Sequence, residues 1–258
     1  MTDLFEPDRL VLGTWAQVAS AEIVDMIGLS GFDVAIVDAE HGYFGLETAE
    51  NMFRACDAVR ITPTIRLPAN DPVMITKAFD AGATAVVIPG VGSQEDAEIA
   101  VGASRFAPRG NRGACPCVRA GGHFIRDWQS YVRRVESETG VVLLVETQAG
   151  LDDFDNIVRV PDVMGFLIGP FDLSVSLGYE GDYRRAEVQD AVDYMVRRAH
   201  EQGVPVMMPV FDANPVEARR QLSEWYERGV RCFVVGTDKI IISAAMTQYA
   251  DNLRITAN

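Results

Sequence analysis

The stretch FDVAIVDAEH, residues Phe32–His41, joins a short apolar run to three polar residues. The run Phe32–Asp38 is too short for a helix and is rich in β-branched residues, a pattern typical of a strand buried on both faces of a parallel sheet. Seven further runs have the same character: VLGTW (Val11–Trp15), ITPTIRL (Ile61–Leu67), TAVVIPG (Thr84–Gly90), GVVLLVE (Gly140–Glu146), VMGFLIGP (Val163–Pro170), VPVMMPV (Val204–Val210) and VRCFVVG (Val230–Gly236). These runs predict eight parallel strands.

Amphipathic helical patterns lie between the runs. Two of them open with Asp71-Pro72 and Asn214-Pro215, an N-cap residue followed by proline, and end at Gly82 and Gly229, residues that tolerate the positive φ of a helix end. Eight strands in 258 residues correspond to about 32 residues per βα unit, which predicts a single (β/α)8 TIM barrel domain over residues 1–258. A doubly wound open sheet is the alternative, but no GxGxxG or phosphate-binding loop follows the first strand.

The composition argues against several partners and locations. Lys and Arg total 23 and Asp and Glu total 37, and the net charge of −14 repels nucleic-acid phosphates and anionic membrane surfaces. The opening MTDLFEPDRL has neither the basic nor the apolar region of a secretory signal, and no apolar stretch reaches about 18 residues. We therefore expect a cytoplasmic protein. The four cysteines, including the neighbours Cys115 and Cys117, form no CxxC pair and indicate neither a disulfide framework nor structural zinc.

Polar residues follow four of the predicted strands at their carboxyl ends, where barrel active sites form. They are Asp38, Glu40 and His41 after the second strand, Arg66 after the third, Glu146 after the fifth and Asp172 after the sixth. Each could have a purely structural role, and Asp172 in particular could cap a helix that begins near Leu173. Their convergence at one end of the barrel favours a functional site.

Glu146 and Asp172 fall on neighbouring strands and form the best candidate metal pair. Two carboxylates completed by water suit Mg²⁺ or Mn²⁺ and could accept Co²⁺, whereas zinc prefers more nitrogen or sulfur ligands. Phe171 and Asp172 would present backbone N–H groups at the start of a helix, a favourable place for a substrate carboxylate. Arg66 can bind a carboxylate or an enolate oxygen through two N–H groups.

The scarcity of lysine and histidine limits the chemistry. A Schiff-base aldolase needs a lysine inside the barrel, but Lys77 falls within a predicted helix and Lys239 follows the last strand. Imine chemistry is therefore not expected, and a metal ion must stabilise any enolate. His41 is the one histidine at a strand end, while His123 lies in a predicted loop and His200 in a predicted helix.

Five segments together resemble a known family: VDAEH (Val37–His41), IRLPANDP (Ile65–Pro72), PRGNRG (Pro108–Gly113), VET (Val145–Thr147) and IGPFDLS (Ile168–Ser174). They are similar to the class II pyruvate aldolases of the HpcH/HpaI group, which includes 4-hydroxy-2-oxoheptanedioate aldolase and 2-dehydro-3-deoxyglucarate aldolase. The resemblance extends from Gly13 to about Gly236. It implies a barrel of the phosphoenolpyruvate/pyruvate-binding type in a homo-oligomer, a hexamer built as a dimer of trimers, with the C-terminal helix exchanged between subunits.

The resemblance also implies roles for individual residues. Glu146 and Asp172 would hold a divalent metal (Mg²⁺, Mn²⁺ or Co²⁺) that pyruvate chelates. The pyruvate carboxylate would meet the backbone amides of Phe171 and Asp172. His41 matches the family's catalytic base, and Arg66 matches its enolate-stabilising arginine.

Two acidic residues would act on the base, again by resemblance alone. Asp38 matches a carboxylate that orients or polarises His41, and Asp80 matches a position credited with raising that histidine's basicity. The sequence departs from the family at two substrate-binding positions. Leu144 stands where the family commonly has glutamine, and Phe171 stands where it often has a small residue. Both changes make the pocket more apolar, so we expect apolar or bulky aldehydes to be accepted.

The expected reaction is the reversible cleavage of a 4-hydroxy-2-oxo acid to pyruvate and an aldehyde through a metal-stabilised pyruvate enolate. Alternatives within the same superfamily are an oxaloacetate-type decarboxylase and a citramalyl- or malyl-CoA lyase. A non-catalytic barrel that binds oxo acids is an alternative from another functional class. Pyruvate release that stops on chelation favours the aldolase, whereas pyruvate binding without turnover favours the binding protein.

Overall fold

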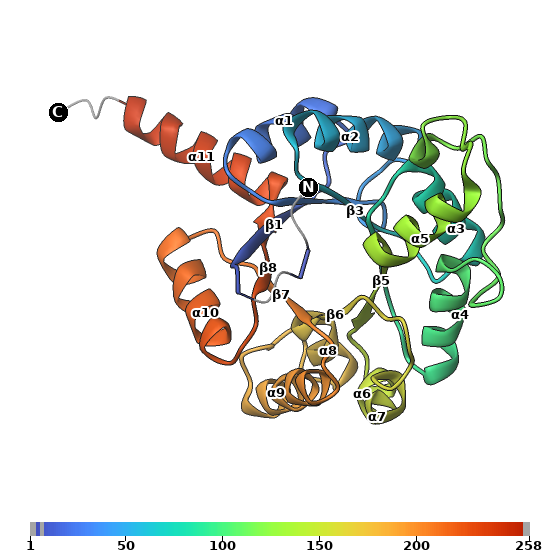
Figure 1. Cartoon of the computed structure of the whole chain (residues 1–258). Coiled ribbons are helices and arrows are strands. Elements are labelled where there is room, and N and C mark those ends of the chain that lie inside the picture. The colour runs from blue at the N-terminus through green and yellow to red at the C-terminus, as the bar shows by residue number, and fades with distance from the viewer. Residues whose placement is uncertain (1–3, 6–7, 255–258) are drawn as a thin grey trace.

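The computed structural model describes residues 4–5 and 8–254, and its eight parallel strands close into a barrel in chain order (Figure 1). The strands are β1 (Val11–Ala16), β2 (Val34–Asp38), β3 (Thr62–Arg66), β4 (Ala85–Ile88), β5 (Gly140–Val145), β6 (Gly165–Ile168), β7 (Val206–Val210) and β8 (Cys232–Thr237). Each coincides with one predicted run to within two residues. The predicted TIM barrel is confirmed, and the open doubly wound sheet is excluded.

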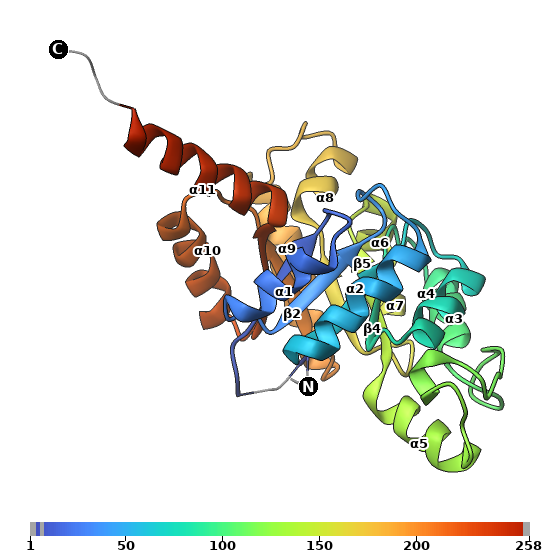
Figure 2. The ribbon, with the colours of Figure 1, turned by 90° about the horizontal axis from the view of Figure 1, so that it is seen from above.

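Helices follow the strands and surround the barrel (Figures 1 and 2). They are α1 (Ala21–Leu29), α2 (Leu46–Val59), α3 (Pro72–Ala81), α4 (Gln94–Ser104), the 3-10 turn η1 (Arg119–Gly121), α5 (Trp128–Glu138), α6 (Gln148–Asp152), α7 (Phe154–Ile157), α8 (Pro170–Ser176), α9 (Ala186–Glu201), α10 (Pro215–Glu227) and α11 (Asp238–Leu253). In the described chain, no helix is both long enough and apolar enough to cross a bilayer.

The helix starts that the sequence predicts form as expected. The Asp71 side chain accepts hydrogen bonds from the N–H groups of Val73 and Met74 at the start of α3. Asn214 caps α10 in the same way. Gly82 ends α3 with φ of 106°, a left-handed conformation that glycine adopts without strain.

The strands are buried on both faces. Along β2, Val34 and Ile36 pack in the cluster that fills the barrel interior, whereas Ala35 and Val37 pack in the layer between the barrel and the helices. This two-sided burial explains why the strands read as continuous apolar runs rather than as alternating patterns.

The register of the strands determines which side chains meet at the carboxyl end of the barrel. Asp38, the last residue of β2, pairs with Arg66, the last residue of β3. β1 pairs with β8 and closes the barrel, and their register shifts between Gly13 and Trp15, so that Trp15 lies opposite Thr237.

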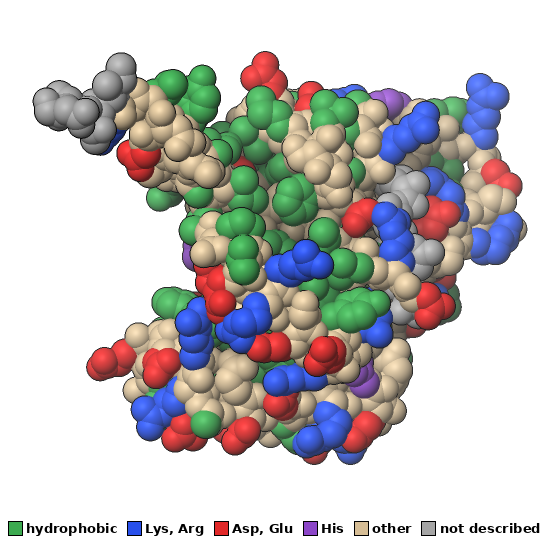
Figure 3. Space-filling model, turned by 90° about the vertical axis from the view of Figure 1, so that its left-hand side faces the viewer, with side chains coloured by type: hydrophobic (Ala, Val, Ile, Leu, Met, Phe, Trp, Pro, Cys, Tyr) green, Lys and Arg blue, Asp and Glu red, His purple; other side chains and the backbone are tan. Residues whose placement is uncertain are grey.

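The last helix does not cover the barrel. Helix α11 leaves the end of β8 and projects away from the body of the molecule in both ribbon views (Figures 1 and 2). Its contacts with the strands are to β8 and β1, where the helix begins. Hydrophobic side chains gather beside and below it in the view of that face (Figure 3).

Candidate active site

A cavity of about 340 Å³ opens at the carboxyl end of the barrel. Its walls come from the ends of β1, β3, β5, β6, β7 and β8 and from the loops and helix starts that follow the strands. Six of the predicted site residues line it: His41, Arg66, Leu144, Glu146, Phe171 and Asp172. The structure therefore brings the residues from separate strand ends to one cavity, as barrel topology requires.

Asp38 and Arg66 form a buried ion pair beside this cavity. The Arg66 Nε and Nη2 atoms donate to the two oxygens of Asp38 over 2.9 and 2.6 Å, and the Asp38 side chain is fully buried. Burial alone would raise the pKa of the Asp38 carboxyl. The hydrogen bonds and charge of Arg66 outweigh this effect, with smaller contributions from Gln17 and the His41 backbone, and the pKa lies below its usual value. The guanidinium also lies 4.1 Å from the ring centroid of Trp15. Arg66 is therefore fixed in both position and plane.

His41 lies at the mouth of the cavity, with a side chain that is 64% exposed. Asp38 accepts a hydrogen bond from the backbone N–H of His41 at 3.3 Å, so the observed contact orients the loop and not the ring. The acidic group nearest the ring is Glu40, whose carboxylate is 4.0 Å from His41 Nε2 and also 2.9 Å from Arg66 Nη1. Burial, only partly offset by Arg66 and His41, raises the pKa of Glu40.

Glu146 and Asp172 form the acidic side of the cavity. Burial first, and then the charge of Asp172, raise the pKa of Glu146 to about 7. The Glu146 carboxylate accepts a hydrogen bond of 3.0 Å from the backbone N–H of Gly90. Gly169 allows this placement, since a Cβ there would lie 2.8 Å from Glu146 Cβ and 2.9 Å from its Oε2. The sequence allowed Asp172 to be a helix cap. In the structure α8 begins at Pro170, so Asp172 lies within the first turn of the helix and does not cap it.

The donor set fits a hard divalent cation. Four carboxylates (Asp38, Glu40, Glu146 and Asp172) lie around the Arg66 guanidinium, an excess of three negative charges within this group when all are ionised. Arg66 is already bound by Asp38 and Glu40. Among the described residues, no three His, Cys, Asp or Glu side chains converge as a complete metal cage. Two carboxylates that leave other positions to water and substrate are the usual arrangement for Mg²⁺.

The other side of the cavity is apolar. Leu144 is buried in the wall, and Phe171 is half exposed at the rim. Further apolar or aromatic side chains complete that side: Leu167, Tyr183, Pro209, Phe211 and Ile240. The two departures from the family pattern therefore belong to a continuous apolar surface.

The structure places Asp80 elsewhere. It lies near the end of α3, five residues before β4 starts and thus at the amino end of the barrel, where its carboxylate is 2.8 Å from Arg112 Nη2. A single chain therefore gives no support for an influence of Asp80 on His41.

Both lysines are exposed, Lys77 on α3 and Lys239 at the start of α11, and neither lines the cavity.

Sequence reasoning missed Gln17 and Trp15, which flank the Asp38–Arg66 pair. Gln17 Nε2 donates to Asp38 Oδ2 at 2.8 Å, and Trp15 supplies the ring beneath Arg66. Both lie at the carboxyl end of β1, so the strand-end rule that identified His41 and Glu146 could have found them.

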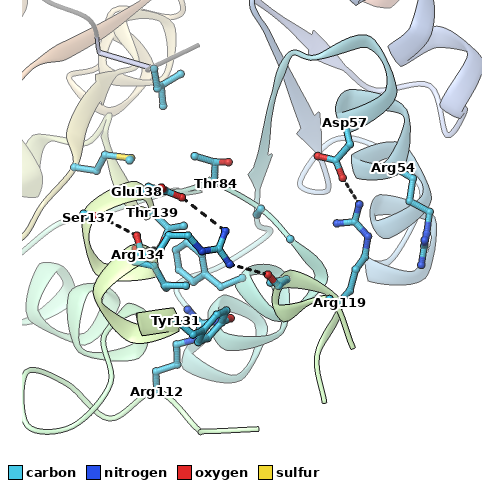
Figure 4. Close-up of a pocket in the computed structure, with 18 of the residues that line it drawn as sticks. Arg54, Asp57, Thr84, Arg112, Arg119, Tyr131, Arg134, Ser137, Glu138 and Thr139 are labelled. Atoms are coloured by element: carbon cyan, nitrogen blue, oxygen red, sulfur yellow. Dashed lines mark hydrogen bonds and ion pairs between the residues drawn. The ribbon is translucent and has the colours of Figure 1, made fainter. Parts of the chain in front are cut away.

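A larger cavity, of about 730 Å³, lies at the opposite end of the barrel (Figure 4). It is lined by residues that precede β4 and β5, such as Thr84 and Thr139, and by four arginines. Each of these guanidinium groups already has an acidic partner: Arg54 with Glu50, Arg112 with Asp80, Arg119 with Asp57 and Arg134 with Glu138. The charge of these arginines is therefore paired within the described residues, although Arg112 Nε and Nη1 have no hydrogen-bond partner there.

Comparisons with known proteins agree with the fold. Residues 11–238 match the model of the HpcH/HpaI aldolase/citrate lyase family. A 5-keto-4-deoxy-D-glucarate aldolase of Escherichia coli (strain K12) is 30% identical over 248 residues, which cover 95% of this chain and 93% of that protein. A family structure from Burkholderia cenocepacia J2315 has a TM-score of 0.89 at 29% identity, with 98% and 97% of the two chains covered.

A more distant neighbour shares the fold alone. The Mycobacterium tuberculosis protein CitE, whose structure was solved with magnesium and pyruvate, has a TM-score of 0.59 at 17% identity, with 96% of this chain and 100% of that chain covered. The family model and the relatives at about 30% identity span nearly the whole chain. This chain therefore belongs to the HpcH/HpaI aldolase/citrate lyase family.

Proposed function

We propose that the protein is a divalent-metal-dependent aldolase that reversibly cleaves a 4-hydroxy-2-oxo acid to pyruvate and an aldehyde. One observation carries the proposal. Glu146 and Asp172, which have no ion-pair partner among the described residues, face the same cavity as a fixed arginine and an exposed histidine. The site thus offers a place for a cation, a fixed positive charge and a base.

Glu146 and Asp172 would hold the cation, with Mg²⁺, Mn²⁺ or Co²⁺ as candidates. When bound, a divalent ion would polarise the C2 carbonyl of the oxo acid and stabilise the charge of the enolate. The acidic character of the cavity supports this assignment. At about 4 Å and an effective dielectric constant of 20, each pair of like charges costs about 4 kcal/mol, so an anionic substrate needs a counter-charge here. The same fold holds magnesium and pyruvate in the M. tuberculosis neighbour.

The substrate carboxylate would lie near the backbone amides of Phe171 and Asp172 in the first turn of α8. Arg66 would then face the oxygen on which negative charge develops. Asp38 takes two of the five N–H bonds of the guanidinium, and Trp15 supports its face. A donor that is held in place before the reaction stabilises developing charge without reorganising.

His41 would act as the base in the cleavage direction. It would accept the proton of the C4 hydroxyl as the C4 oxygen forms the aldehyde carbonyl and the C3–C4 bond breaks. The bonding electrons pass to the pyruvate enolate, which Arg66 stabilises, and a proton from solvent then converts the enolate carbon to the methyl group of pyruvate. Exposure of His41 at the cavity mouth allows its proton to return to water.

The test is pyruvate release from a generic 4-hydroxy-2-oxo acid, with and without a chelator. We expect turnover that stops on chelation and returns with Mg²⁺ or Mn²⁺. Turnover by the metal-free protein would contradict the proposal. Pyruvate binding without turnover would favour the non-catalytic barrel, and turnover restricted to oxaloacetate would favour the decarboxylase.

We also propose that copies of the chain assemble through α11. Where α11 leaves the barrel, a groove of about 680 Å³ remains over the outer side of β1 and β8. Its apolar lining includes Leu10, Leu12, Phe32, Leu222 and Val235. The exposed apolar residues of α11, which are Ile241, Met246, Tyr249 and Leu253, would complement such a groove on a second copy. This arrangement supports the exchanged C-terminal helix that the resemblance implies, and the hexamer stays an expectation of the resemblance.

A further inference from the structure

A chain of hydrogen bonds connects the root of α11 to Arg66. It begins at Asp238, the first residue of α11, which is only 3% exposed. Asp238 Oδ2 accepts the backbone N–H groups of Gln17 and Val18 at 2.9 and 2.8 Å, and Oδ1 accepts the N–H of Lys239 at 2.7 Å. A buried carboxylate is unfavourable unless its oxygens accept hydrogen bonds. Here those bonds hold the loop after β1 against the end of β8.

Gln17 extends the connection to the ion pair. While its backbone is held by Asp238, its side-chain Nε2 donates to Asp38 Oδ2 at 2.8 Å. The same oxygen accepts from Arg66 Nη2 at 2.6 Å. The other oxygen, Oδ1, accepts from Arg66 Nε and from the backbone N–H groups of Glu40 and His41.

This arrangement controls the plane of the Arg66 guanidinium. Two parallel hydrogen bonds force a guanidinium into the plane of the carboxylate that binds it. The backbone amides restrain Oδ1 of Asp38, and apart from Arg66 itself the donor to Oδ2 among the described residues is Gln17, which therefore restrains the rotation of the carboxylate. Glu40 binds the guanidinium separately, at Nη1. The Trp15 ring lies on one face of the guanidinium and supports the same orientation.

We propose that Gln17 and Asp238 are positioning residues that orient Arg66 through Asp38. The inference rests on the proposed function only in taking Arg66 to face the developing enolate. Neither residue needs to touch the reacting atoms. Since a displacement of about 1 Å in a catalytic group can lower a rate by about 100-fold, we expect loss of either residue to reduce kcat by about 10- to 100-fold.

Gln17→Leu removes the donor and preserves the approximate size of the side chain. Its kcat should fall by a similar factor in the cleavage of a 4-hydroxy-2-oxo acid and in the decarboxylation of oxaloacetate, because both form the enolate that Arg66 faces. KM and the affinity for Mn²⁺ should stay within about threefold of the wild type, since Glu146 and Asp172 are unchanged. Gln202→Leu, the same change at an exposed position beyond the end of α9, is the matched control.

A spectroscopic measurement tests the orientation of Arg66 without relying on turnover. The chain has three tryptophans, so replacing Trp128 and Trp225 with Phe leaves Trp15 as the only indole. In this background, Arg66→Lys provides the reference, which is the fluorescence of Trp15 when no guanidinium is stacked on its ring. Gln17→Leu should move the Trp15 fluorescence toward that reference, and Gln202→Leu should not. If the wild type cleaves no 4-hydroxy-2-oxo acid, the proposed function fails, but this measurement still decides the positioning role.

Asp238→Ala supplies a second, independent variant. Because Asp238 acts through Gln17, the double variant Gln17→Leu/Asp238→Ala should lose no more kcat than the worse of the two single variants. The two losses would then be clearly non-additive. Additive losses would overturn the series arrangement. If Gln17→Leu raises KM but leaves kcat and the Trp15 fluorescence unchanged, Gln17 contacts the substrate directly and the proposal is overturned. Wild-type values of kcat and fluorescence would overturn it as well.

Discussion

The proposed roles of His41 and Arg66 can be separated by comparing two reactions that share one enolate. Cleavage of a 4-hydroxy-2-oxo acid needs a base for the hydroxyl proton, whereas decarboxylation of oxaloacetate forms the same enolate by loss of CO₂. The wild type should therefore decarboxylate oxaloacetate as a side activity. His41→Ala should lower cleavage and spare most of the decarboxylation, while an Arg66 variant should lower both.

The structure determines which substitutions are informative. His41 is 64% exposed, so His41→Ala removes no buried contact and should change stability by no more than about 0.5 kcal/mol. Arg66→Ala would instead leave the fully buried Asp38 without its partner, at a cost of about 3–5 kcal/mol. Arg66→Lys is preferable because it retains a positive charge near Asp38 and removes only the planar fork and the stacking on Trp15.

The expected magnitudes differ enough to be distinguished. A positioned base contributes about 10²–10⁴-fold, or about 2.7–5.4 kcal/mol, so His41→Ala should lose that much cleavage. Arg66→Lys should lose about 10- to 100-fold in both reactions, because a hydrogen bond to a charged group contributes about 1.5–3 kcal/mol.

Pyruvate formation from both substrates is measured at saturating Mg²⁺, alongside thermal unfolding and Mn²⁺ binding for each variant. The reasoning is refuted if His41→Ala loses the two activities in equal proportion while the metal remains bound. It is also refuted if Arg66→Lys affects cleavage alone.

Further predictions concern the metal, the reaction class, the acceptor and the assembly. Glu146→Gln removes a ligand charge and should abolish both Mn²⁺ binding, measured by calorimetry, and cleavage, while circular dichroism stays that of the wild type. Borohydride reduction in the presence of pyruvate should leave no adduct on Lys77 or Lys239 by mass spectrometry, and a labelled lysine would indicate imine chemistry. The wild type should prefer apolar or bulky aldehydes to succinic semialdehyde by about 1–3 kcal/mol in kcat/KM, and Leu144→Gln should reduce this preference; a sharp preference for succinic semialdehyde would exclude the apolar-pocket argument. Met246→Asp should lower the mass measured by light scattering, and an unchanged oligomer would show that this part of α11 is not an interface.

The fold could be predicted from sequence because parallel strands buried on both faces leave a strong local signal. The eight apolar runs located every strand to within two residues, and Asp71, Gly82 and Asn214 marked helix ends that the structure confirms. The direction of α11 left no such signal, because its apolar residues are distributed around the helix and do not mark one buried face.

The candidate site was predictable as far as topology alone determines it. Residues at the carboxyl ends of strands must converge, and His41, Arg66 and Glu146 do. The partners of each group depend on side-chain geometry that no spacing shows. Asp38 binds Arg66 and the backbone of His41, and Gln17 reaches Asp38 across 21 residues of sequence.

The cavity has a charged side and an apolar side. The charged side, from β2, β3, β5 and β6, contains the side chains proposed to act on the oxo acid, and these residues are among those that carry the resemblance to the family. The apolar side includes both positions that depart from that pattern, Leu144 and Phe171, together with Phe211 and Ile240 from the last two βα units. Decarboxylation of oxaloacetate needs only the charged side, whereas aldol chemistry also needs a surface that accepts the aldehyde. On the proposed mechanism the reaction type would depend on the charged residues, and the aldehyde preference would depend on the apolar ones.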